Sequence, residues 1–196
     1  NSSGVIASIT NRTKTLGPIT DKKSRGLIII EALEQKTAKS AFKSIRNIDF
    51  DAYQDFNLLL ADQHHVFVVQ LNSKNKDKVS EKVILPGLHM LTSKNINDPT
   101  CPRIKKFLSL FLDKKRPSPN EYHFEEWKSL LSKKAKYNEK GNFLNFYEKS
   151  GFGTVSSSII AIKSTNEQFA NTNCENIWLF ANGAPNSNNY KKMKIL

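Results

Sequence analysis

Blocks of apolar residues alternate with polar turns along most of the chain. Runs rich in aliphatic and β-branched residues predict strands, because such side chains suit a pleated, half-buried surface. The runs with this pattern are residues 5–10, 56–62, 65–71, 79–85, 88–92, 154–162 and 177–181. Residues 56–62 and 65–71 flank a tight turn and are apolar enough to be two buried strands.

Apolar residues at helical spacing predict helices between these strands. Ser24 is placed to cap a helix that starts near Leu27, and Thr37 to cap a short helix with Phe42 and Ile45 on its apolar face. Residues 49–55 are expected to form a loop.

Two further helices are predicted in the second half, over residues 103–112, with Pro102 in the first turn, and over residues 121–134. Strands, then helices, then strands in one short chain predict an α+β fold. We expect a single domain over residues 1–196, with residues 113–150 as a helical and loop excursion.

The first four residues, Asn1-Ser2-Ser3-Gly4, are of types that form turns, and they lead directly into the first predicted strand. One interpretation is a hairpin turn whose upstream strand precedes Asn1, so that the chain begins inside a domain. The other interpretation is a disordered terminus.

The composition is that of a soluble globular protein, with 38% hydrophobic and 24% charged residues. The longest apolar runs fall far short of the roughly 20 residues that cross a bilayer. Only two cysteines occur, Cys101 and Cys174, which excludes a disulfide framework and favours a cytoplasmic location.

Thirty Lys and Arg against eighteen Asp and Glu give a net charge of +12, which favours acidic partners. The basic residues are scattered over predicted loops and helix surfaces, whereas nucleic-acid readers gather them in one stripe among stacking aromatics. We therefore place a nucleic-acid-binding module third among the functions considered. No phosphate-binding loop or paired-histidine metal motif occurs, and no metal site is predicted.

Several short motifs occur in an order that is fairly specific as a set. They are residues 9–12, 24–26, 56–62, 85–92, 98–99 with 102–103, 151–158 and 178–185. This ordered set resembles the NRDE family, also called the transport-and-Golgi-organisation family, and especially its bacterial members. The resemblance runs from about Gly4 to Pro185.

The resemblance implies an N-terminal-nucleophile-hydrolase-like fold, a four-layer αββα sandwich. Family members usually carry a nucleophilic Cys and an Asn-Arg-Asp-Glu motif, and both would stand upstream of Asn1. We therefore expect an N-terminally incomplete sandwich that is not by itself a competent hydrolase. Two departures agree with this expectation: Ser93 and Val155 stand where relatives carry an amide donor and an arginine.

Four positions match family positions that could serve a site. By resemblance, Asn11 could donate to an oxyanion or a ligand, and Arg25, Asn57 and Asp62 are further candidates for ligand binding. Each also has a structural interpretation, since Arg25 can pair with a carboxylate and Asn57 and Asp62 can bond to local backbone.

The resemblance implies a protein that handles a small-molecule ligand, and it does not by itself imply an enzyme. Eukaryotic relatives are implicated in haem trafficking and lipid metabolism, so haem and lipid or acyl-CoA molecules are the candidate ligands. The alternative is an amide hydrolase whose cysteine nucleophile precedes Asn1.

Overall fold

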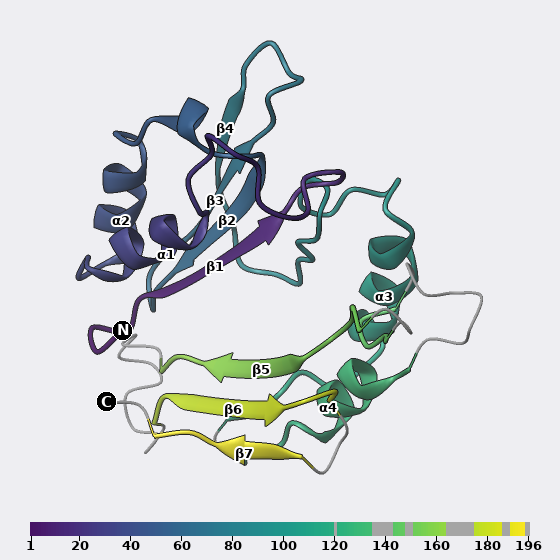
Figure 1. Ribbon diagram of the computed structural model, residues 1–196. Coiled ribbons are helices and arrows are strands. Elements are labelled where there is room, and N and C mark those ends of the chain that lie inside the picture. The colour runs from purple at the N-terminus through teal and green to yellow at the C-terminus, as the bar shows by residue number, and fades with distance from the viewer. Residues whose placement is uncertain (120, 135–142, 148–150, 164–174, 186–188, 195–196) are drawn as a thin grey trace. The chain divides into compact units, whose positions relative to one another are not determined.

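The structure is a computed structural model that describes residues 1–196 except 120, 135–142, 148–150, 164–174, 186–188 and 195–196. The chain divides into two units, Asn1–Asp98 and Pro99–Leu196, which are described separately. Both combine helices with antiparallel strands, so the predicted α+β class is confirmed (Figure 1). The four-layer stacking and the single domain over residues 1–196 stay predictions.

The N-terminal unit has a four-stranded antiparallel sheet in the order β1-β2-β3-β4, with two helices packed on one face (Figure 1). Its elements are β1 (Ile6–Asn11), α1 (Gly26–Leu33), α2 (Ala38–Ile45), the 3-10 turn η1 (Phe50–Ala52), β2 (Phe56–Ala61), β3 (Val66–Leu71) and β4 (Val79–Val83). Four predicted strands are therefore confirmed to within two residues at each end.

The core of this unit lies between the two helices and alternate residues of β2 and β3. Because successive side chains of a strand point to opposite faces, every second residue of each strand reaches the helices. The buried members are Ile28, Ala32, Ala38, Ala41, Phe42, Ile45, Phe56, Leu58, Leu60, Phe67, Val69 and Leu71. Burying each large apolar side chain contributes about 1.5–3 kcal/mol. The packing of the two helices on the sheet is therefore the main source of the unit's stability.

Helix α2 begins with the cap that its sequence predicts. The Thr37 hydroxyl accepts the Ser40 N–H at 3.0 Å, and the Ser40 hydroxyl accepts the Thr37 N–H at 3.2 Å. This reciprocal pair satisfies two backbone donors at the helix start. At α1 the Ser24 hydroxyl accepts the Gly26 N–H at 3.2 Å, while Arg25 occupies the position before the first helical residue.

The first four residues form a hydrogen-bonded turn. The Asn1 carboxamide oxygen accepts the N–H groups of Ser3 and Val5, and its nitrogen donates to the carbonyls of Leu33 and Gln35 at the end of α1. Gly4 has a φ of +84°, which glycine adopts without strain. Residues 1–4 are therefore an anchored turn and not an unstructured end.

The strand predicted over residues 88–92 is wrong, since these residues form a loop. Side chains take the backbone groups that a neighbouring strand would use. The Asn97 side chain accepts the Met90 N–H at 2.8 Å, and the Thr92 carbonyl accepts from Thr10 Oγ1 and Asn57 Nδ2.

Helix α2 is joined to the outer strand β4 by a charged contact. The Arg46 guanidinium lies 4.5 Å from the centre of the Phe42 ring and pairs with Glu81 of β4. Phe42 in turn stacks on Phe67 of β3 with ring centres 4.4 Å apart. The contact continues the apolar layer outward to the edge of the sheet.

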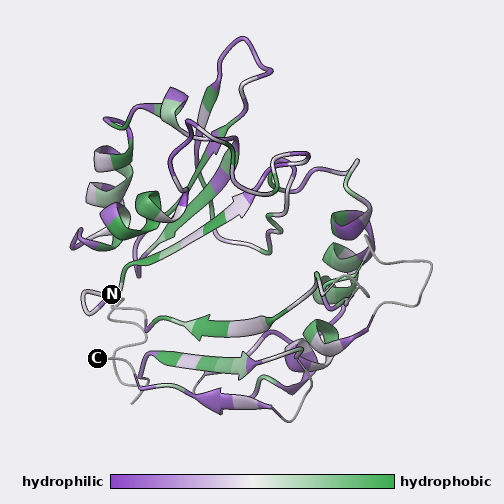
Figure 2. Cartoon of the chain, viewed as in Figure 1, coloured by the Kyte–Doolittle hydropathy of each residue, from purple (hydrophilic) through white to green (hydrophobic). Residues whose placement is uncertain are grey.

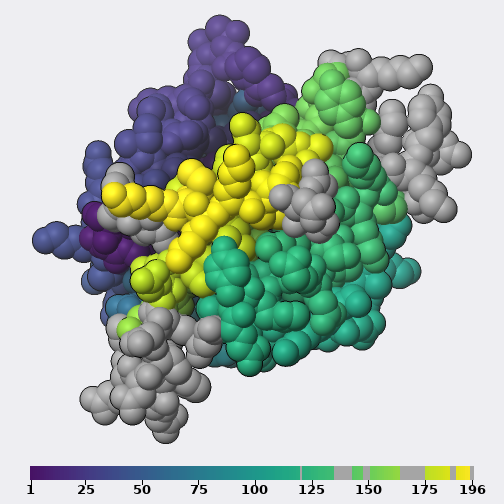
Figure 3. All heavy atoms as spheres, turned by 90° about the horizontal axis from the view of Figure 1, so that it is seen from below, coloured from purple at the N-terminus to yellow at the C-terminus, as the bar shows by residue number. Residues whose placement is uncertain are grey.

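The second unit has a three-stranded antiparallel sheet in the order β5-β6-β7. Its elements are α3 (Pro102–Leu112), α4 (Glu125–Ser132), β5 (Ser156–Ala161), β6 (Ile177–Asn182) and β7 (Tyr190–Lys192). Phe124 at the start of α4 packs with Ile159, Ile177 and Leu179 of the sheet. Figure 3 shows the C-terminal strands, in yellow, against the teal helical segment of this unit.

The C-terminal strand β7 was not predicted, because its few residues are mostly polar. In Figure 2 it is purple beside the greener β5 and β6. Helix α3 confirms its prediction, with Pro102 in the first turn.

Helix α4 begins four residues later than predicted. Tyr122 has a left-handed φ of +54°, and His123 forms an antiparallel bridge with Ser118. Tyr122 and His123 therefore do not belong to the helix. In the predicted excursion over residues 113–150, which the structure describes in part, Phe143 and Asn145 are buried.

The reciprocal cap of α2 predicts a measurable loss of stability for Thr37→Ala. Removing the hydroxyl leaves the Ser40 N–H without its acceptor, so the free energy of unfolding falls by about 1 kcal/mol. Denaturant unfolding measures the change. Thr20→Ala, in an exposed loop, is the control, and an equal effect of both substitutions would contradict the prediction.

Candidate functional site

A row of polar side chains crosses the first sheet on the face away from its helices. The antiparallel register sets Thr10 opposite Asn57, Asn57 opposite Gln70, and Gln70 opposite Ser80. Because these residues alternate with the core residues of the same strands, they lie on the other face. We call Thr10, Asn57, Gln70 and Ser80 the polar row.

Asn57 is at the centre of the polar row and is completely buried. Its Nδ2 donates to the carbonyl oxygens of Thr92 at 2.7 Å and Lys94 at 2.9 Å. Its Oδ1 accepts from Arg12 Nη1 at 2.6 Å and Gln70 Nε2 at 2.9 Å. The amide therefore uses both donors and both acceptor positions, and it joins the sheet to Arg12 and to the loop of residues 92–95.

Arg12 directly follows β1 and projects to the same face as Asn57. Its Nη2 donates to Asn95 Oδ1 at 3.0 Å, so two of the five guanidinium N–H groups have protein acceptors in these bonds. Burial lowers the pKa of Arg12, and the nearby carboxylates of Asp55 and Asp98 act against that shift. The side chain is a fixed cation with N–H groups available to an anion.

Residues 12–15 form a turn that Arg25 holds in place. Thr15 N–H and Oγ1 both donate to the Arg12 carbonyl, at 3.2 and 2.8 Å. Arg25 donates to Thr15 Oγ1, to the Thr15 carbonyl and to the Asp55 carbonyl at 2.9–3.1 Å. Arg25 therefore supports the turn that carries Arg12; burial lowers the pKa of Arg25, against the effect of Asp55.

Within this turn Lys14 has a left-handed backbone, with a φ of +69°. A residue with a Cβ is held in such a conformation at a cost of order 1–3 kcal/mol when surrounding bonds determine it. Those bonds are present here, since the Thr13 N–H donates to the Ser93 carbonyl at 3.1 Å and Arg25 fixes Thr15. Glycine or asparagine would adopt this backbone with less strain.

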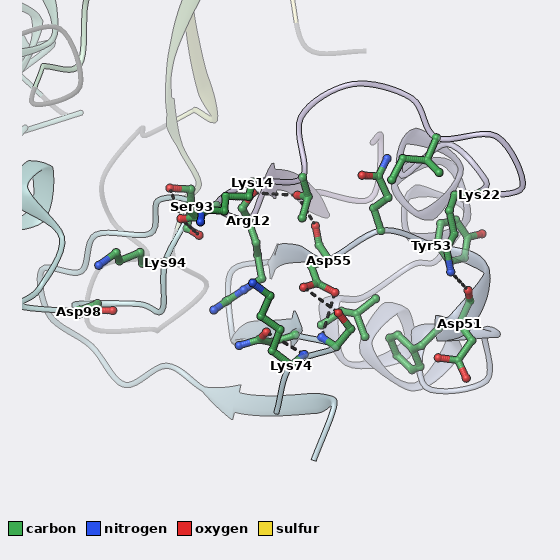
Figure 4. A pocket seen from close by; sticks show the side chains of 18 residues that line it. Arg12, Lys14, Lys22, Asp51, Tyr53, Asp55, Lys74, Ser93, Lys94 and Asp98 are labelled. Atoms are coloured by element: carbon green, nitrogen blue, oxygen red, sulfur yellow. Dashed lines mark hydrogen bonds between the residues drawn. The ribbon is translucent and has the colours of Figure 1, made fainter. Parts of the chain in front are cut away.

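A pocket of about 570 Å³ opens beside this turn, and the lining residues that the structure describes belong to the N-terminal unit. Figure 4 shows Arg12, Lys14, Ser93 and Lys94 towards one end, Tyr53, Lys22 and Asp51 towards the other, and Asp55 and Lys74 between them. The lining residues are Arg12, Thr13, Lys14, Thr15, Ile19, Lys22, Phe50, Asp51, Tyr53, Gln54, Asp55, Leu71, Asn72, Ser73, Lys74, Ser93, Lys94 and Asp98.

Positive side chains outnumber carboxylates in this lining. The cations are Arg12, Lys14, Lys22, Lys74 and Lys94, and the carboxylates are Asp51, Asp55 and Asp98. A hydrogen bond from Lys78 at 2.9 Å lowers the pKa of Asp51, and the Asp55 carboxylate accepts the Ser73 N–H at 3.0 Å. These carboxylates already have protein partners, and the cations of the lining outnumber them, so the pocket is suited to an anion.

The four predicted site residues do not come together in this pocket. Asn57 and Arg25 support it through Arg12 and the turn of residues 12–15. Asn11 pairs with Phe56, and strand alternation places it on the helix-covered face with Ala7 and Ile9. Asp62 lies at the turn between β2 and β3.

Asp62 holds the start of a helix and a hairpin turn together. Its carboxylate accepts the Ala38 N–H at 2.7 Å and the N–H groups of His64 and His65 at 2.8 Å. Burial by itself raises the pKa of Asp62, but these three backbone donors outweigh it, so the pKa lies below its ordinary value of 3.8. This geometry agrees with the structural interpretation of Asp62.

Sequence reasoning missed Arg12, Lys14 and Asp55. Arg12 stands in the same short motif as Asn11, and counting by twos from Thr10 would have placed Arg12, rather than Asn11, on the face of Asn57. Lys14 and Asp55 carry no comparable sequence signal.

Among the described residues no three His, Cys, Asp or Glu side chains lie close enough to hold a metal ion. In the same part of the chain no helix has the length and apolar character to cross a membrane.

A comparison with protein families settles the relationship of the chain. The family model for Transport and Golgi organisation 2 matches residues 1–176. The chain belongs to the Transport and Golgi organisation 2 family. The family resemblance drawn from the short motifs is thereby confirmed. No curated protein in our comparison matches the chain.

The match to the Transport and Golgi organisation 2 family includes the whole N-terminal unit, and with it the polar row and the pocket. Asn57 makes four hydrogen bonds of 2.6–2.9 Å at the site, and Asp62 makes three outside it.

Asn57→Asp is expected to destabilise the protein although it barely changes the shape of the side chain. A carboxylate cannot donate, so the Lys94 carbonyl loses the bond from this side chain and the Thr92 carbonyl keeps only the one from Thr10 Oγ1. Both carbonyls then face a negative charge, and the loss costs about 2 kcal/mol or more. Chemical denaturation measures the loss. Asn75→Asp, the same change at an exposed loop position, is the control, and an Asn57→Asp variant of wild-type stability would rule out the role assigned to this amide.

The hydrogen bonds of Asp62 predict a pH-dependent contribution to stability. Because the pKa is lower in the folded state, the contribution is complete above the unfolded value and is lost as the pH falls through the folded value. Asp62→Asn should therefore be less stable than wild type at pH 7, with a gap that narrows below about pH 4. Thermal melts from pH 7 to pH 2 measure the gap, with exposed Asp77→Asn as control; a gap that does not change with pH would argue against these bonds.

Proposed function

We propose that this chain is a ligand-handling member of its family that binds a small amphipathic anion in the pocket of the N-terminal unit. The observation that carries the proposal is the pocket itself, in which a partly buried arginine, fixed by Asn57 and Asn95, shares the lining with four lysines. Its volume of about 570 Å³ falls in the range of roughly 300–1,000 Å³ typical of small-molecule sites.

The lining supports a ligand with two chemically different parts. Arg12 and Lys14 offer positive charge towards one end, while Ile19, Phe50 and Leu71 offer apolar surface. Figure 4 places Tyr53 at the end away from Arg12. An acyl-CoA thioester has the matching parts, since its phosphates suit the cations and its acyl chain suits the apolar side chains.

Haem, the other candidate ligand, suits the pocket less well. Its propionates could pair with the lysines, but the described lining residues include no His, Cys or Met to bind the iron. Burial raises the pKa of Tyr53, which disfavours the phenolate that could serve instead. The lining therefore favours an acyl-CoA over haem.

The hydrolase alternative relies on a cysteine that precedes Asn1, and among the described residues of the pocket lining there is no cysteine that could replace it. Cys101, the described cysteine, is 7% exposed, lies in the other unit and is not part of the pocket. We therefore propose binding, in the cytoplasm, as the activity of this chain, and we expect no thioester turnover from it.

Calorimetric titration with octanoyl-CoA tests the proposal. Wild-type protein is expected to bind it saturably, and Arg12→Gln to bind it at least tenfold more weakly, because a charge-assisted bond to an anion contributes about 1.5–3 kcal/mol. Lys43→Gln removes an exposed cation of α2 outside the pocket and should change the affinity less than twofold.

Two parallel measurements distinguish the alternatives. Haem is titrated by its Soret absorbance, and release of free thiol from octanoyl-CoA is followed with a thiol reagent. Absence of saturable octanoyl-CoA binding would refute the proposal, as would equal affinities of Arg12→Gln and Lys43→Gln. Thiol release by wild type that Cys101→Ala abolishes would show turnover by this chain itself and would contradict the expectation that it has none.

A further inference from the structure

Lys14 occupies a position where its backbone conformation favours a different residue. Its φ of +69° is one that glycine or asparagine adopts more readily. The turn is nevertheless held in this shape from both sides, by the Ser93 carbonyl at Thr13 and by Arg25 at Thr15. A lysine at this point therefore costs stability relative to glycine or asparagine.

The lysine side chain lines the pocket beside Arg12, its neighbour in the same turn. Figure 4 places both residues at the end of the pocket that also holds Ser93. The ammonium group of Lys14 and the remaining guanidinium N–H groups of Arg12 supply more hydrogen-bond donors than the two oxygens of a carboxylate can accept. A phosphate monoester offers three acceptor oxygens and a charge of nearly −2.

Resting on the proposed function, we propose that Lys14 is a specificity-determining residue that makes the pocket select ligands with a phosphate group over ligands with a carboxylate. Arg12 supplies the fixed cation, and the Arg25-supported turn presents Lys14 beside it as the second. The strained backbone is the means by which the turn places the ammonium group at this end of the pocket.

The test compares octyl phosphate with octanoate, two probes with similar chains and different anionic groups. In Lys14→Gly the affinity for octyl phosphate should fall about tenfold, since one charge-assisted contact is lost. The affinity for octanoate should fall about threefold or less, because Arg12 alone can pair with a carboxylate. Lys14→Asn should repeat this result, and Lys14→Arg, which keeps the charge, should retain the preference for phosphate.

The melting temperature is a second readout, and it is expected to rise in the variant whose phosphate affinity falls. Relief of the left-handed backbone should raise the melting temperature of Lys14→Gly by about 2 °C while phosphate affinity falls. Lys14→Arg should melt like wild type. A variant that only damaged the fold would lose stability and affinity together.

The outcomes separate this inference from the proposed function. The role of Lys14 would be overturned if Lys14→Gly lowered the affinities for octyl phosphate and octanoate equally, or lowered neither. A lower melting temperature of this variant would also overturn it. Failure of octyl phosphate to bind wild-type protein that binds octanoyl-CoA would overturn it as well. Failure of octanoyl-CoA to bind wild-type protein would instead overturn the proposed function.

Discussion

The site of the N-terminal unit depends on one buried amide. Asn57 donates to two loop carbonyls and accepts from Arg12 and Gln70, so a single side chain determines how the loop of residues 92–95 and the guanidinium lie on the sheet. A buried polar group is acceptable only when all its bonds are made. These bonds tie the loop and the arginine to the strand, so the place of the Arg12 cation in the pocket follows from the sheet.

The sheet can carry this polar face because the apolar core lies on its other face. Core residues of β2 and β3 pack under α1 and α2, which leaves the opposite face of the same strands free to hold the polar row. Because successive side chains point to opposite faces, neighbouring residues of one strand contribute to the core and to the polar row in turn. Asn57 lies between Phe56 and Leu58, both completely buried in the core.

The strands and helices of the core were predictable because their patterns are dictated by burial. The strand predicted at residues 88–92 failed because Leu88 and Met90 imitate alternation while the side chain of Asn97 takes a backbone donor that a strand would need. In the site, Asn57 and Arg25 followed from the family resemblance and not from periodicity. Strand alternation from Thr10 could have placed Arg12 on the face of Asn57. The position of Lys14 depends on a turn held by Arg25 and Ser93, so local patterns could not reveal it.

The contact of Arg46 with Phe42 and Glu81 has a consequence for local opening. Buried apolar side chains hold β2 and β3 under the helices, whereas β4 contributes only the partly buried Val79 to that core and is tied to α2 by a partly exposed ion pair. Salt screens such a pair but scarcely affects apolar packing. Rising ionic strength should therefore loosen the β4 edge before the rest of the sheet, so that amide hydrogens of residues 79–83 exchange faster in salt while those of β2 keep their protection.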